Sequence, residues 1–461
     1  ILAAGAGTRM KSDKPKVVHE VLGKPLVRWV VDAAHDAGIE DVVTVLGHMS
    51  EKVAPFVEGD TKIAIQTQQL GTGDAVNAGR EAFTQADGSI AEGSLVVLSG
   101  DCPLITPETI QALIAKREET GAAVVVLTMH MDDPFGYGRI VREGEAVVRI
   151  VEQKDATPEE AAITECNSGF YCFDAPALFD ALSRVSNDNA QGEYYLTDVL
   201  EICRNDGREV LALQTADAEE AMGVNSRVQL AQATRAMQHR INNRHMMAGV
   251  TMWTRSTFIG PDVEIAQDVE LWPQTYLLGA TKVGSHSVIG PNTRLTDTQV
   301  GSGARVDETV AIEARIDDAA ECGPRAYLRP GTHLCEGAKA GTHVEIKKST
   351  IGKGSKVPHL SYIGDTTMGE NVNIGAGSIT CNYDGVNKNH TEIGDNVFVG
   401  SDTMMVAPVN IGAGAIIGAS SCITRDVAPD ALALERADQR EIEGWAAKHM
   451  AKLKAKKKAA K

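Results

Sequence analysis

The sequence of 461 residues contains no window that is long and apolar enough to span a membrane. Its eight Cys are scattered without any CxxC pair, which argues against a zinc site and, in so long a chain, against a disulfide framework. Basic residues are in the minority, and the net charge of −17 argues against nucleic-acid binding as the main function. These absences favour a cytoplasmic protein with idle thiols, and the length suffices for two or three domains.

Aliphatic residues return at every sixth position in the second half of the chain, and Gly or another small residue follows many of them. Such a repeat is the signature of a parallel β-helix, in which three short strands form one triangular coil and stacked coils bury the inward side chains. The two runs are Ile259, Ile265, Leu271, Leu277, Val283, Ile289 and Leu295, and Ile393, Val399, Met405, Ile411, Ile417 and Ile423. We therefore expect a left-handed β-helix over residues 250–440.

The repeat is interrupted at two places. Between Thr380 and Ile393 the spacing breaks, and the polar segment from Cys381 to His390 is interpreted as a loop extruded from the coil. Between Asp317 and Lys348 charged residues are frequent, although a solenoid core does not need them. Polar insertions on a regular scaffold predict a ligand site.

The first 220 residues follow a different pattern, in which short aliphatic runs alternate with amphipathic stretches. We expect strands near residues 41–46, 62–66, 94–98 and 122–127, and helices near 24–37, 72–85 and 107–119. This alternation predicts a mostly parallel, Rossmann-like α/β sheet covered by helices on both faces. Ligands of such sheets bind at the carboxyl ends of the strands.

The junction between the halves contains neither Pro nor Gly from Ser226 to Ala248, which predicts one connecting helix that ends at Gly249. The sequence is thus divided into an α/β domain (1–224), a linker helix (225–249), the β-helix domain (250–440) and a basic tail (441–461). The tail is expected to be a solvated, mobile end because residues 448–461 contain seven Lys and no acidic residue.

A Gly-rich turn follows the first expected strand, and it carries Gly5, Gly7, Arg9 and, further on, Lys16. Glycines let backbone N–H groups approach a phosphate closely, and the two cations can neutralise a triphosphate. The turn is neither a GxGxxG motif nor a Walker A loop, because the GK[ST] ending is absent. We interpret the turn as a nucleotide site. Tight packing is the alternative, but it would explain only the glycines and not the two cations.

Asp101 follows Ser99 and Gly100 at the end of another expected strand. A carboxylate in this position suits a Mg²⁺ ion that bridges substrate phosphates, although an Asp that caps the turn before Pro103 would look the same. An amide at Gln66, before a Gly-rich helix start, could read the edge of a base.

Several motifs together resemble a known family. They are Leu2–Lys16, Gln66 with Gly71–Thr72, Gly100–Leu104, Gly136–Arg139, Asn189–Tyr195, Gly223–Asn225, Arg329–Gly331, Val344–Lys348, His359–Tyr362 and Cys381–Gly385. With the β-helix they resemble the bacterial bifunctional N-acetylglucosamine-1-phosphate uridylyltransferases and glucosamine-1-phosphate N-acetyltransferases. The first motif is shared by sugar-nucleotide transferases generally, and the motifs of the second half decide the family. The resemblance extends from residue 1 to about 445.

For the first half, the resemblance implies transfer of UMP from UTP to N-acetylglucosamine 1-phosphate with release of pyrophosphate. Asp101 and Asn225 would hold Mg²⁺, while Arg9 and Lys16 would steady the phosphates as catalytic residues. The nucleotide site would include Leu2, Ala3, Ala4, Gly5, Gln66, Gly71, Thr72, Ser99 and Gly100, and the N-acetylglucosamine site Gly138, Glu152 and Asn167.

For the second half, the resemblance makes His359 the general base that takes a proton from the amine of glucosamine 1-phosphate as the amine attacks acetyl-CoA, with Glu345 placed to orient the imidazole. It implies a homotrimer whose acetyl site lies between subunits. Binding of the sugar phosphate would fall to Arg329, Lys347, Tyr362 and Asn373, and binding of acetyl-CoA to Ala376, Asn382, Tyr383, Ser401, Ala419 and Arg436.

Two other interpretations are possible from the sequence. One is a single-activity sugar-1-phosphate nucleotidyltransferase whose β-helix serves only oligomerisation or regulation; His359 and Asn382 count against it. The other is a non-catalytic scaffold, against which the charged motif with Arg9 and Lys16 counts. The sequence also departs from the family beside Arg436, where Glu435 stands in place of the more usual Ser.

Overall fold

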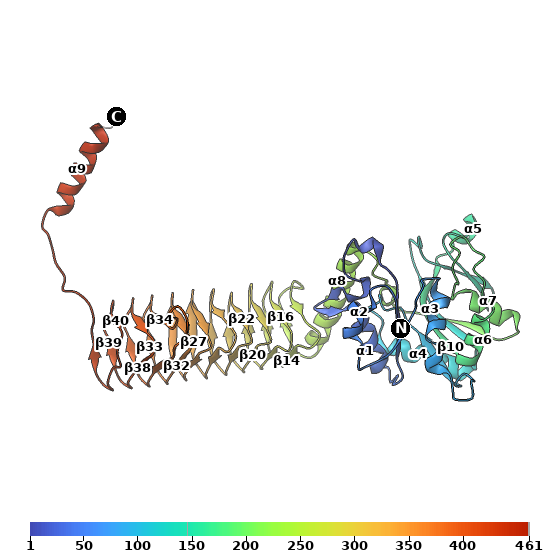
Figure 1. The fold of residues 1–461 in the computed structure, drawn as a ribbon, viewed down its shortest axis with the longest axis horizontal. Helices are drawn as coiled ribbons and strands as arrows, with labels where there is room; N and C mark the ends of the chain where they lie inside the picture. The colour runs from blue at the N-terminus through green and yellow to red at the C-terminus, as the bar shows by residue number, and fades with distance from the viewer. Residues whose placement is uncertain (145, 460–461) are drawn as a thin grey trace. The chain divides into compact units, whose positions relative to one another are not determined.

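The computed structural model describes residues 1–144 and 146–459, which divide into two compact units (Figure 1). The first unit comprises Ile1–Arg244 with Ile259–Pro261, and the second comprises His245–Phe258 with Asp262–Lys461.

The sheet of the first unit begins with a parallel part. Strand β1 (Leu2–Ala3) pairs in parallel with β4 (Val43–Leu46), which pairs in parallel with β5 (Lys62–Ile65). Backbone bonds continue this part toward β6 (Ser94–Val97), because Leu2 N donates to Leu98 O over 2.8 Å and Gly100 N donates to Leu2 O over 2.9 Å. The ends of β1 and β6 therefore lie side by side.

The rest of the sheet is built around β10 (Glu165–Asp174), which runs antiparallel to β6, to β7 (Val124–His130) and to β8 (Arg139–Glu143). Strand β11 (Val210–Gln214) pairs in parallel with β7, and β9 (Ala146–Val151) forms a hairpin with β8. The alternation of strands and helices revealed neither the antiparallel β10 nor the strands β8, β9 and β11. The expected strands are found as β4 to β7, and residues 124–127 are fully buried, as in a strand covered on both faces.

The expected helices are present as α1 (Leu26–Asp36), α3 (Thr72–Ala78) and α4 (Pro107–Thr120). Helix α4 begins where the Thr106 hydroxyl accepts from Thr109 N over 3.3 Å and ends at Gly121, whose φ of 68° suits a residue without Cβ. Helix α3 is shorter than expected, and a 3₁₀ turn (Arg80–Phe83) follows it. Further helices of this unit are α2 (Ser50–Val53), α5 (Pro158–Ala161), α6 (Ala175–Leu182) and α7 (Asp198–Asn205).

The expected connecting helix is α8 (Arg227–Met247), and it ends before Gly249, whose φ is 96°. The second unit is a parallel β-helix with hexapeptide repeats (Figure 1). Its strands form three sheets of 11, 10 and 9 strands, in which each strand up to β37 pairs with the third strand further along the chain, while β39 pairs with β41. The left-handed β-helix predicted from the repeat is confirmed.

The repeat residues point inward as expected. In the 11-stranded sheet, Leu271 of β15 (Glu270–Leu271) lies beside Ile289 of β18 (Val288–Ile289), and both are fully buried. Buried hydroxyls at the coil corners donate to carbonyls; Thr332 Oγ1 donates to Arg329 O over 2.7 Å, and Thr281 Oγ1 donates to Leu278 O over 2.6 Å. Stacking thus buries an aliphatic column in each sheet, and bonds of this kind pair corner hydroxyls with the backbone.

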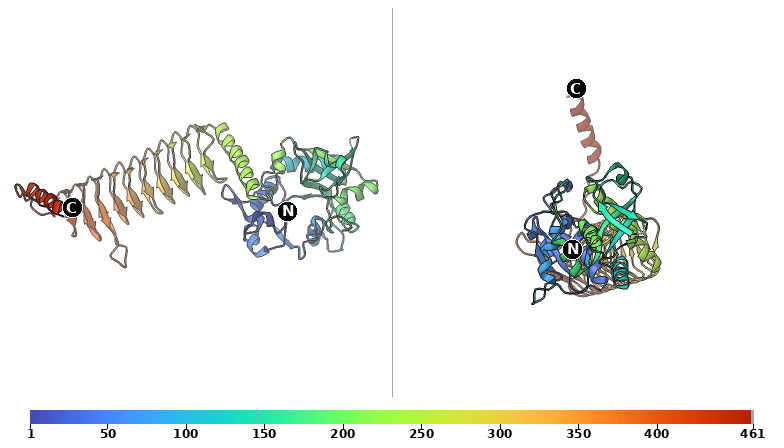
Figure 2. Two further views of the ribbon diagram at one scale, coloured as in Figure 1. Left: turned by 90° about the horizontal axis from the view of Figure 1, so that it is seen from above. Right: turned by 90° about the vertical axis from the view of Figure 1, so that its right-hand side faces the viewer.

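The extruded loop lies between β34 (Ile379–Cys381) and β35 (Thr391–Ile393), where a loop leaves the solenoid (Figure 2, left). A single bridge between Tyr383 and Lys388 closes it into a small hairpin. Backbone N–H groups of Asn387 and Val386 donate to Asp384 and lower the pKa of its carboxyl.

The basic tail contains a helix, α9 (Trp445–Ala459), and its described residues are all exposed. Within residues 1–144 and 146–459, no helix combines the length and the apolar character that a membrane span requires.

Candidate active sites

Lys16 joins the two predicted metal ligands of the first unit. Its Nζ donates to Oδ2 of Asp101, which follows β6, and to Oδ1 of Asn225 over 2.9 Å. The position of Asp101 is fixed further because Val224 N donates to its carbonyl oxygen over 2.9 Å. Residues from three distant segments thus place two oxygen ligands around one cationic atom.

The Gly-rich turn brings Lys16 to this position. Gly7 has a φ of 61°, and a Cβ there would lie 2.6 Å from the Cβ of Lys16, so only Gly allows this approach. Ala3 and Ala4 are buried, whereas Gly5 and Arg9 are exposed beyond the end of β1. Backbone and guanidinium groups are therefore accessible to an anion at this edge.

Gln66 lies buried at the end of β5, where its Nε2 donates to Gly71 O over 3.1 Å and to Asp74 Oδ2 over 2.8 Å. Gly71 has a φ of 118°, and a Cβ there would lie 2.5 Å from Tyr194 O. Thr72 accepts from Leu196 N over 3.1 Å through its hydroxyl. Gln66, Gly71 and Thr72 therefore form one corner of the unit, at the start of α3.

The segment from Asn189 to Leu196 closes over this corner. Gly73 N donates to Tyr194 O over 2.8 Å, and Tyr194 N donates to Leu70 O over 2.7 Å. Asn189 holds the turn, because its Nδ2 donates to Glu193 O over 2.6 Å. The residue pattern assigned no role to this segment, and only its likeness to the family marked it.

The three residues predicted to hold the sugar are also brought together. Asn167 N donates to Gly138 O over 2.9 Å, and a Cβ on Gly138 would lie 3.5 Å from Glu152 Oε1. Burial raises the pKa of Glu152, and the charges of Asp155 and Asp198 raise it further. The Asn167 amide donates to Tyr171 over 2.7 Å.

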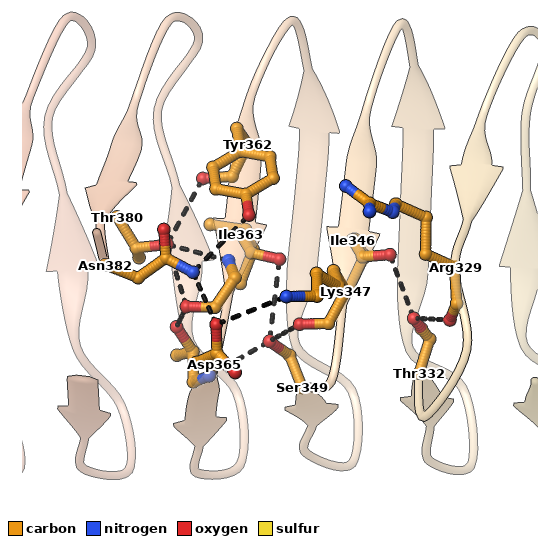
Figure 3. Close-up of polar contacts among 12 residues, drawn as sticks. Arg329, Thr332, Ile346, Lys347, Ser349, Tyr362, Ile363, Asp365, Thr380 and Asn382 are labelled. Carbon is orange, nitrogen blue, oxygen red and sulfur yellow. Dashed lines mark hydrogen bonds and ion pairs between the residues drawn. The ribbon is translucent and has the colours of Figure 1, made fainter. Parts of the chain in front are cut away.

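In the second unit, Lys347, Tyr362 and Asn382 gather around Asp365 (Figure 3). The Nδ2 of Asn382 donates to Asp365 and lies 3.4 Å from the hydroxyl of Tyr362, while Lys347 Nζ lies 3.9 Å from Asp365. These residues come from β28 (Glu345–Lys347), β31 (Tyr362–Gly364) and the turn after β34, which are neighbours in one sheet. Asp365 was missed because it belongs to no polar cluster in the sequence.

Arg329 lies one coil away, after β25 (Tyr327–Leu328), and donates to Glu345 over 2.9 Å. His359 ends β30 (Lys356–His359), and its side chain is exposed. Among the described residues Glu345 is bonded to Arg329 and not to the imidazole of His359. The sequence suggested that Glu345 orients His359, and the structure gives this carboxylate a different partner.

Four residues predicted to bind acetyl-CoA follow one corner of the β-helix. Backbone bonds link this corner from coil to coil: Gly377 N to Leu360 O (3.1 Å), Asp402 N to Ala376 O (2.7 Å) and Ser420 N to Ser401 O (2.8 Å). At the far end the guanidinium of Arg436 donates to Ala419 O over 3.0 Å. The corner starts beside His359 and continues past the ends of β33 (Asn373–Ile374), β36 (Phe398–Val399) and β39 (Ile416–Ile417).

The remaining predicted residues are Asn373, Tyr383 and Asn382. Asn373 is on β33 and pairs with Lys356 of the strand that His359 ends. Tyr383 is exposed in the extruded loop, and Lys388 Nζ lies 3.9 Å from the centre of its ring. Asn382, in contrast, is buried and belongs to the Asp365 cluster rather than to the exposed corner.

The two units match two known families. Residues 1–201 match the MobA-like NTP transferase domain, and residues 390–425 match the bacterial transferase hexapeptide repeat. The chain therefore combines a nucleotidyltransferase domain with a hexapeptide-repeat transferase domain.

Relatives that match over nearly the whole chain contain both domains together. The chain is 50% identical over 454 residues to the bifunctional protein GlmU of Streptomyces coelicolor, covering 97% of this chain and 93% of that protein. It is 49% identical over 454 residues to the protein of the same name from Streptomyces avermitilis (97% and 93% covered), and 48% identical over 441 residues to that of Carboxydothermus hydrogenoformans (95% and 97% covered). The chain belongs to the family of the bifunctional protein GlmU.

The protein is accordingly a bifunctional enzyme, a uridylyltransferase and a glucosamine-1-phosphate acetyltransferase, with nucleotide and acetyl-CoA substrates. The prediction from the sequence is confirmed at this level. The single-activity and scaffold interpretations receive no support from relatives that match over both halves.

Proposed function

We propose that the first unit transfers UMP from UTP to N-acetylglucosamine 1-phosphate, and that the second unit first acetylates glucosamine 1-phosphate to supply that substrate. The observation that carries the assignment of the first unit is the position of Lys16 Nζ between Asp101 and Asn225. A cation-binding arrangement at the carboxyl ends of β1 and β6 is where a sheet of this kind binds nucleotide phosphates.

Asp101 and Asn225 fit a Mg²⁺ ion. Both offer an oxygen to the same positively charged atom, and carboxylate and amide oxygens are ligands that Mg²⁺ accepts together with substrate phosphates. When bound there, Mg²⁺ would neutralise phosphate charge. Lys16 would then turn from the two side chains toward the phosphates, which it can reach because it lies at the edge of the Gly-rich turn.

The uridylyl step needs alignment more than a covalent nucleophile. The phosphate of the sugar attacks the α-phosphorus of UTP, and pyrophosphate leaves from the opposite side. Arg9 and Lys16 would stabilise the charge on the phosphates, while Gly138, Glu152 and Asn167 hold the sugar. Gln66 and Gly71 would hold the base beside the start of α3.

The acetyl step needs a base, because an ammonium group cannot attack a thioester. His359 would accept the proton, because histidine is the most frequent general base in enzymes and this side chain is exposed at the end of β30. Arg329 and Lys347 would bind the sugar phosphate, with Tyr362 and Asn373 beside them. Glu345 would position Arg329, which it contacts, and Asp365 would position Lys347 and Asn382.

Acetyl-CoA would lie along the corner that leads from His359 to Arg436. Successive coils are spaced by about 4.8 Å, so the ends of β30, β33, β36 and β39 span roughly 14 Å. The small side chains of Ala376, Ser401 and Ala419 leave room for an extended ligand along this line. The guanidinium of Arg436 stands where a phosphate group at the far end could bind.

The second unit is proposed to form a homotrimer through its 10-stranded sheet. Hexapeptide repeats suggest an oligomer, and the outward side chains of this sheet are largely apolar, although Arg294 and Glu345 interrupt them. The outward apolar residues are Phe258, Tyr276, Val310, Tyr327, Tyr362, Ile379 and Met404. Outward ion pairs occur on all three sheets, such as Lys339 with Glu321, Lys282 with Glu264 and, on the 10-stranded sheet, Arg329 with Glu345.

Two assays on one preparation test the proposal. UTP with N-acetylglucosamine 1-phosphate should release pyrophosphate, and acetyl-CoA with glucosamine 1-phosphate should release a free thiol.

Substitution of Tyr327 by Glu should convert the trimer into a monomer, as measured by sedimentation, whereas Thr367→Glu on the outward face of the 9-stranded sheet should not. An unchanged trimer with Tyr327→Glu would exclude this sheet as the interface.

A further inference from the structure

A cluster on the β-helix has no part in either reaction. Asp317, His333 and Cys335 come from neighbouring strands of the 9-stranded sheet, β23 (Arg315–Ile316) and β26 (His333–Leu334). Asp317 follows the first strand and Cys335 the second, while His333 points outward from β26. All three side chains are partly exposed, and one ligand atom from each lies within 4.8 Å of the others.

The contacts converge on one nitrogen. Asp317 Oδ2 lies 2.7 Å from His333 Nε2, and Cys335 Sγ lies 3.9 Å from the same Nε2. A nucleophile relay would place the acid on one ring nitrogen and the thiol on the other, and this geometry does not. A carboxylate, an imidazole and a thiol directed to one point are instead the donor set of a borderline-soft metal ion.

We propose that Asp317, His333 and Cys335 bind a Zn²⁺ ion, with water as the fourth ligand. The usual bond lengths to zinc place tetrahedral nitrogen and oxygen ligands about 3.3 Å apart, and nitrogen and sulfur ligands about 3.6 Å apart. The oxygen therefore moves away from Nε2 by about 0.6 Å, and the sulfur moves closer by about 0.3 Å. Small side-chain rotations provide both movements, because the three side chains are partly exposed.

The surroundings support this ligand set. The Nε of Arg315 donates to Asp317 Oδ1 over 2.7 Å, which leaves Oδ2 for the metal and fixes the orientation of the carboxylate, as outer partners do in metal sites. The ion would connect two successive coils of the solenoid.

The absence of CxxC spacing does not exclude such a site in a solenoid. His333 and Cys335 are two residues apart, but Asp317 comes from the previous coil, 16 residues before His333. Stacking brings the third ligand into place, so a linear motif cannot reveal it.

The test uses the full-length protein after treatment with a chelator. Titration with Co²⁺, as a spectroscopic substitute for zinc, should produce one equivalent of a sulfur-to-cobalt charge-transfer band, and Zn²⁺ should displace it. Cys335→Ser and His333→Ala should each abolish the band and weaken Zn²⁺ binding by more than about tenfold. Cys422→Ser, at an exposed thiol in a distant coil, should leave both unchanged.

Cobalt bound at the proposed Mg²⁺ site would not contribute to the charge-transfer band, because Asp101 and Asn225 offer oxygen ligands and no thiolate. The uridylyl and acetyl assays report whether each variant is folded, since none of the three residues is assigned to either reaction. A band that persists in Cys335→Ser would place the thiolate ligand elsewhere and overturn the proposal. Absence of any band in the unsubstituted protein would overturn it as well.

Discussion

Lys16 Nζ donates to Asn225 Oδ1 over 2.9 Å, and the same atom donates to Asp101. The ammonium group thus lies between the two oxygens. Because a Mg²⁺ ion and this ammonium group would compete for the same oxygens, we infer that metal binding frees Lys16 for the phosphates. This relationship leads to the first prediction.

Replacing Asp101 by Ala should abolish pyrophosphate release and leave acetyl transfer near normal, since the carboxylate belongs to the first unit only. Steady-state assays of both activities measure the effect. Asp87→Ala, at an exposed loop, is the control and should retain both activities. Full uridylyl activity in Asp101→Ala would remove this residue from the mechanism.

Replacing His359 by Ala should lower the kcat of acetyl transfer by roughly 10²–10⁴-fold, the usual worth of a positioned general base. Binding of acetyl-CoA and uridylyl transfer should change little. His286→Ala is a matched control, because His286 is an exposed His in an earlier coil. If the His359 variant keeps acetyl transfer within a few-fold at pH 7.5, the base is another residue, and Glu345 is the next to test.

Replacing Arg436 by Ala should raise the KM for acetyl-CoA while the KM for glucosamine 1-phosphate stays the same. The guanidinium of Arg436 donates to Ala419 O at the far end of the corner proposed to bind acetyl-CoA. The residues proposed to bind the sugar phosphate belong to earlier coils. Arg425→Ala, another exposed Arg of the last coils, serves as the control. Equal KM values in both variants would contradict a role for Arg436 in binding.

The two units should be separable. A fragment of residues 1 to about 230 should be monomeric and keep uridylyl transfer, and a fragment from about 250 onward should trimerise, because the repeat carries its own buried core. Analytical ultracentrifugation and the two assays check both statements. A monomeric C-terminal fragment would refute trimerisation through the β-helix.

Burial raises the pKa of Asp198 to about 6, with contributions from the charges of Glu201 and Asp155. Because the pKa of an unfolded Asp is about 3.9, the native state holds this proton more tightly, and the stabilisation is lost as the pH rises through about 6. Asp198→Asn should therefore raise the free energy of unfolding at pH 7.5 by about 1–2 kcal/mol, a value reduced for partial exposure, and should give no gain near pH 4.

Thermal unfolding at the two pH values measures this difference. Asp188→Asn, at an exposed position in the same unit, should change neither value. A gain of equal size at both pH values would show that the substitution acts through packing and not through the charge.

The sequence was sufficient for the features that depend on local periodicity. The six-residue repeat predicted the β-helix because one residue in six faces the core, and the aliphatic runs located β4 to β7. The antiparallel direction of β10 was not predicted, because the residue pattern of a buried strand is the same in either direction. Its direction depends on pairing with β6 and β7, which are distant in the chain.

The sequence likewise predicted some residues of the candidate sites and missed others. Asp101 and Lys16 were predicted from the residue pattern and Asn225 through the likeness to the family, and the structure brings the three together. Asp365 was not found, because its partners Lys347 and Asn382 come from the coils before and after it. Contacts between coils join residues many positions apart, so neither periodicity nor a short motif indicates them.

The corner that carries Ala376, Ser401 and Ala419 repeats once per coil. The distance between two points along this corner is therefore a whole number of coil spacings. Deleting one complete coil between His359 and Arg436 would keep the inward aliphatic residues in register, yet it would shorten the path by about 4.8 Å. The solenoid would thus act as a molecular ruler, in which the number of coils sets the length of cofactor that can join the two ends.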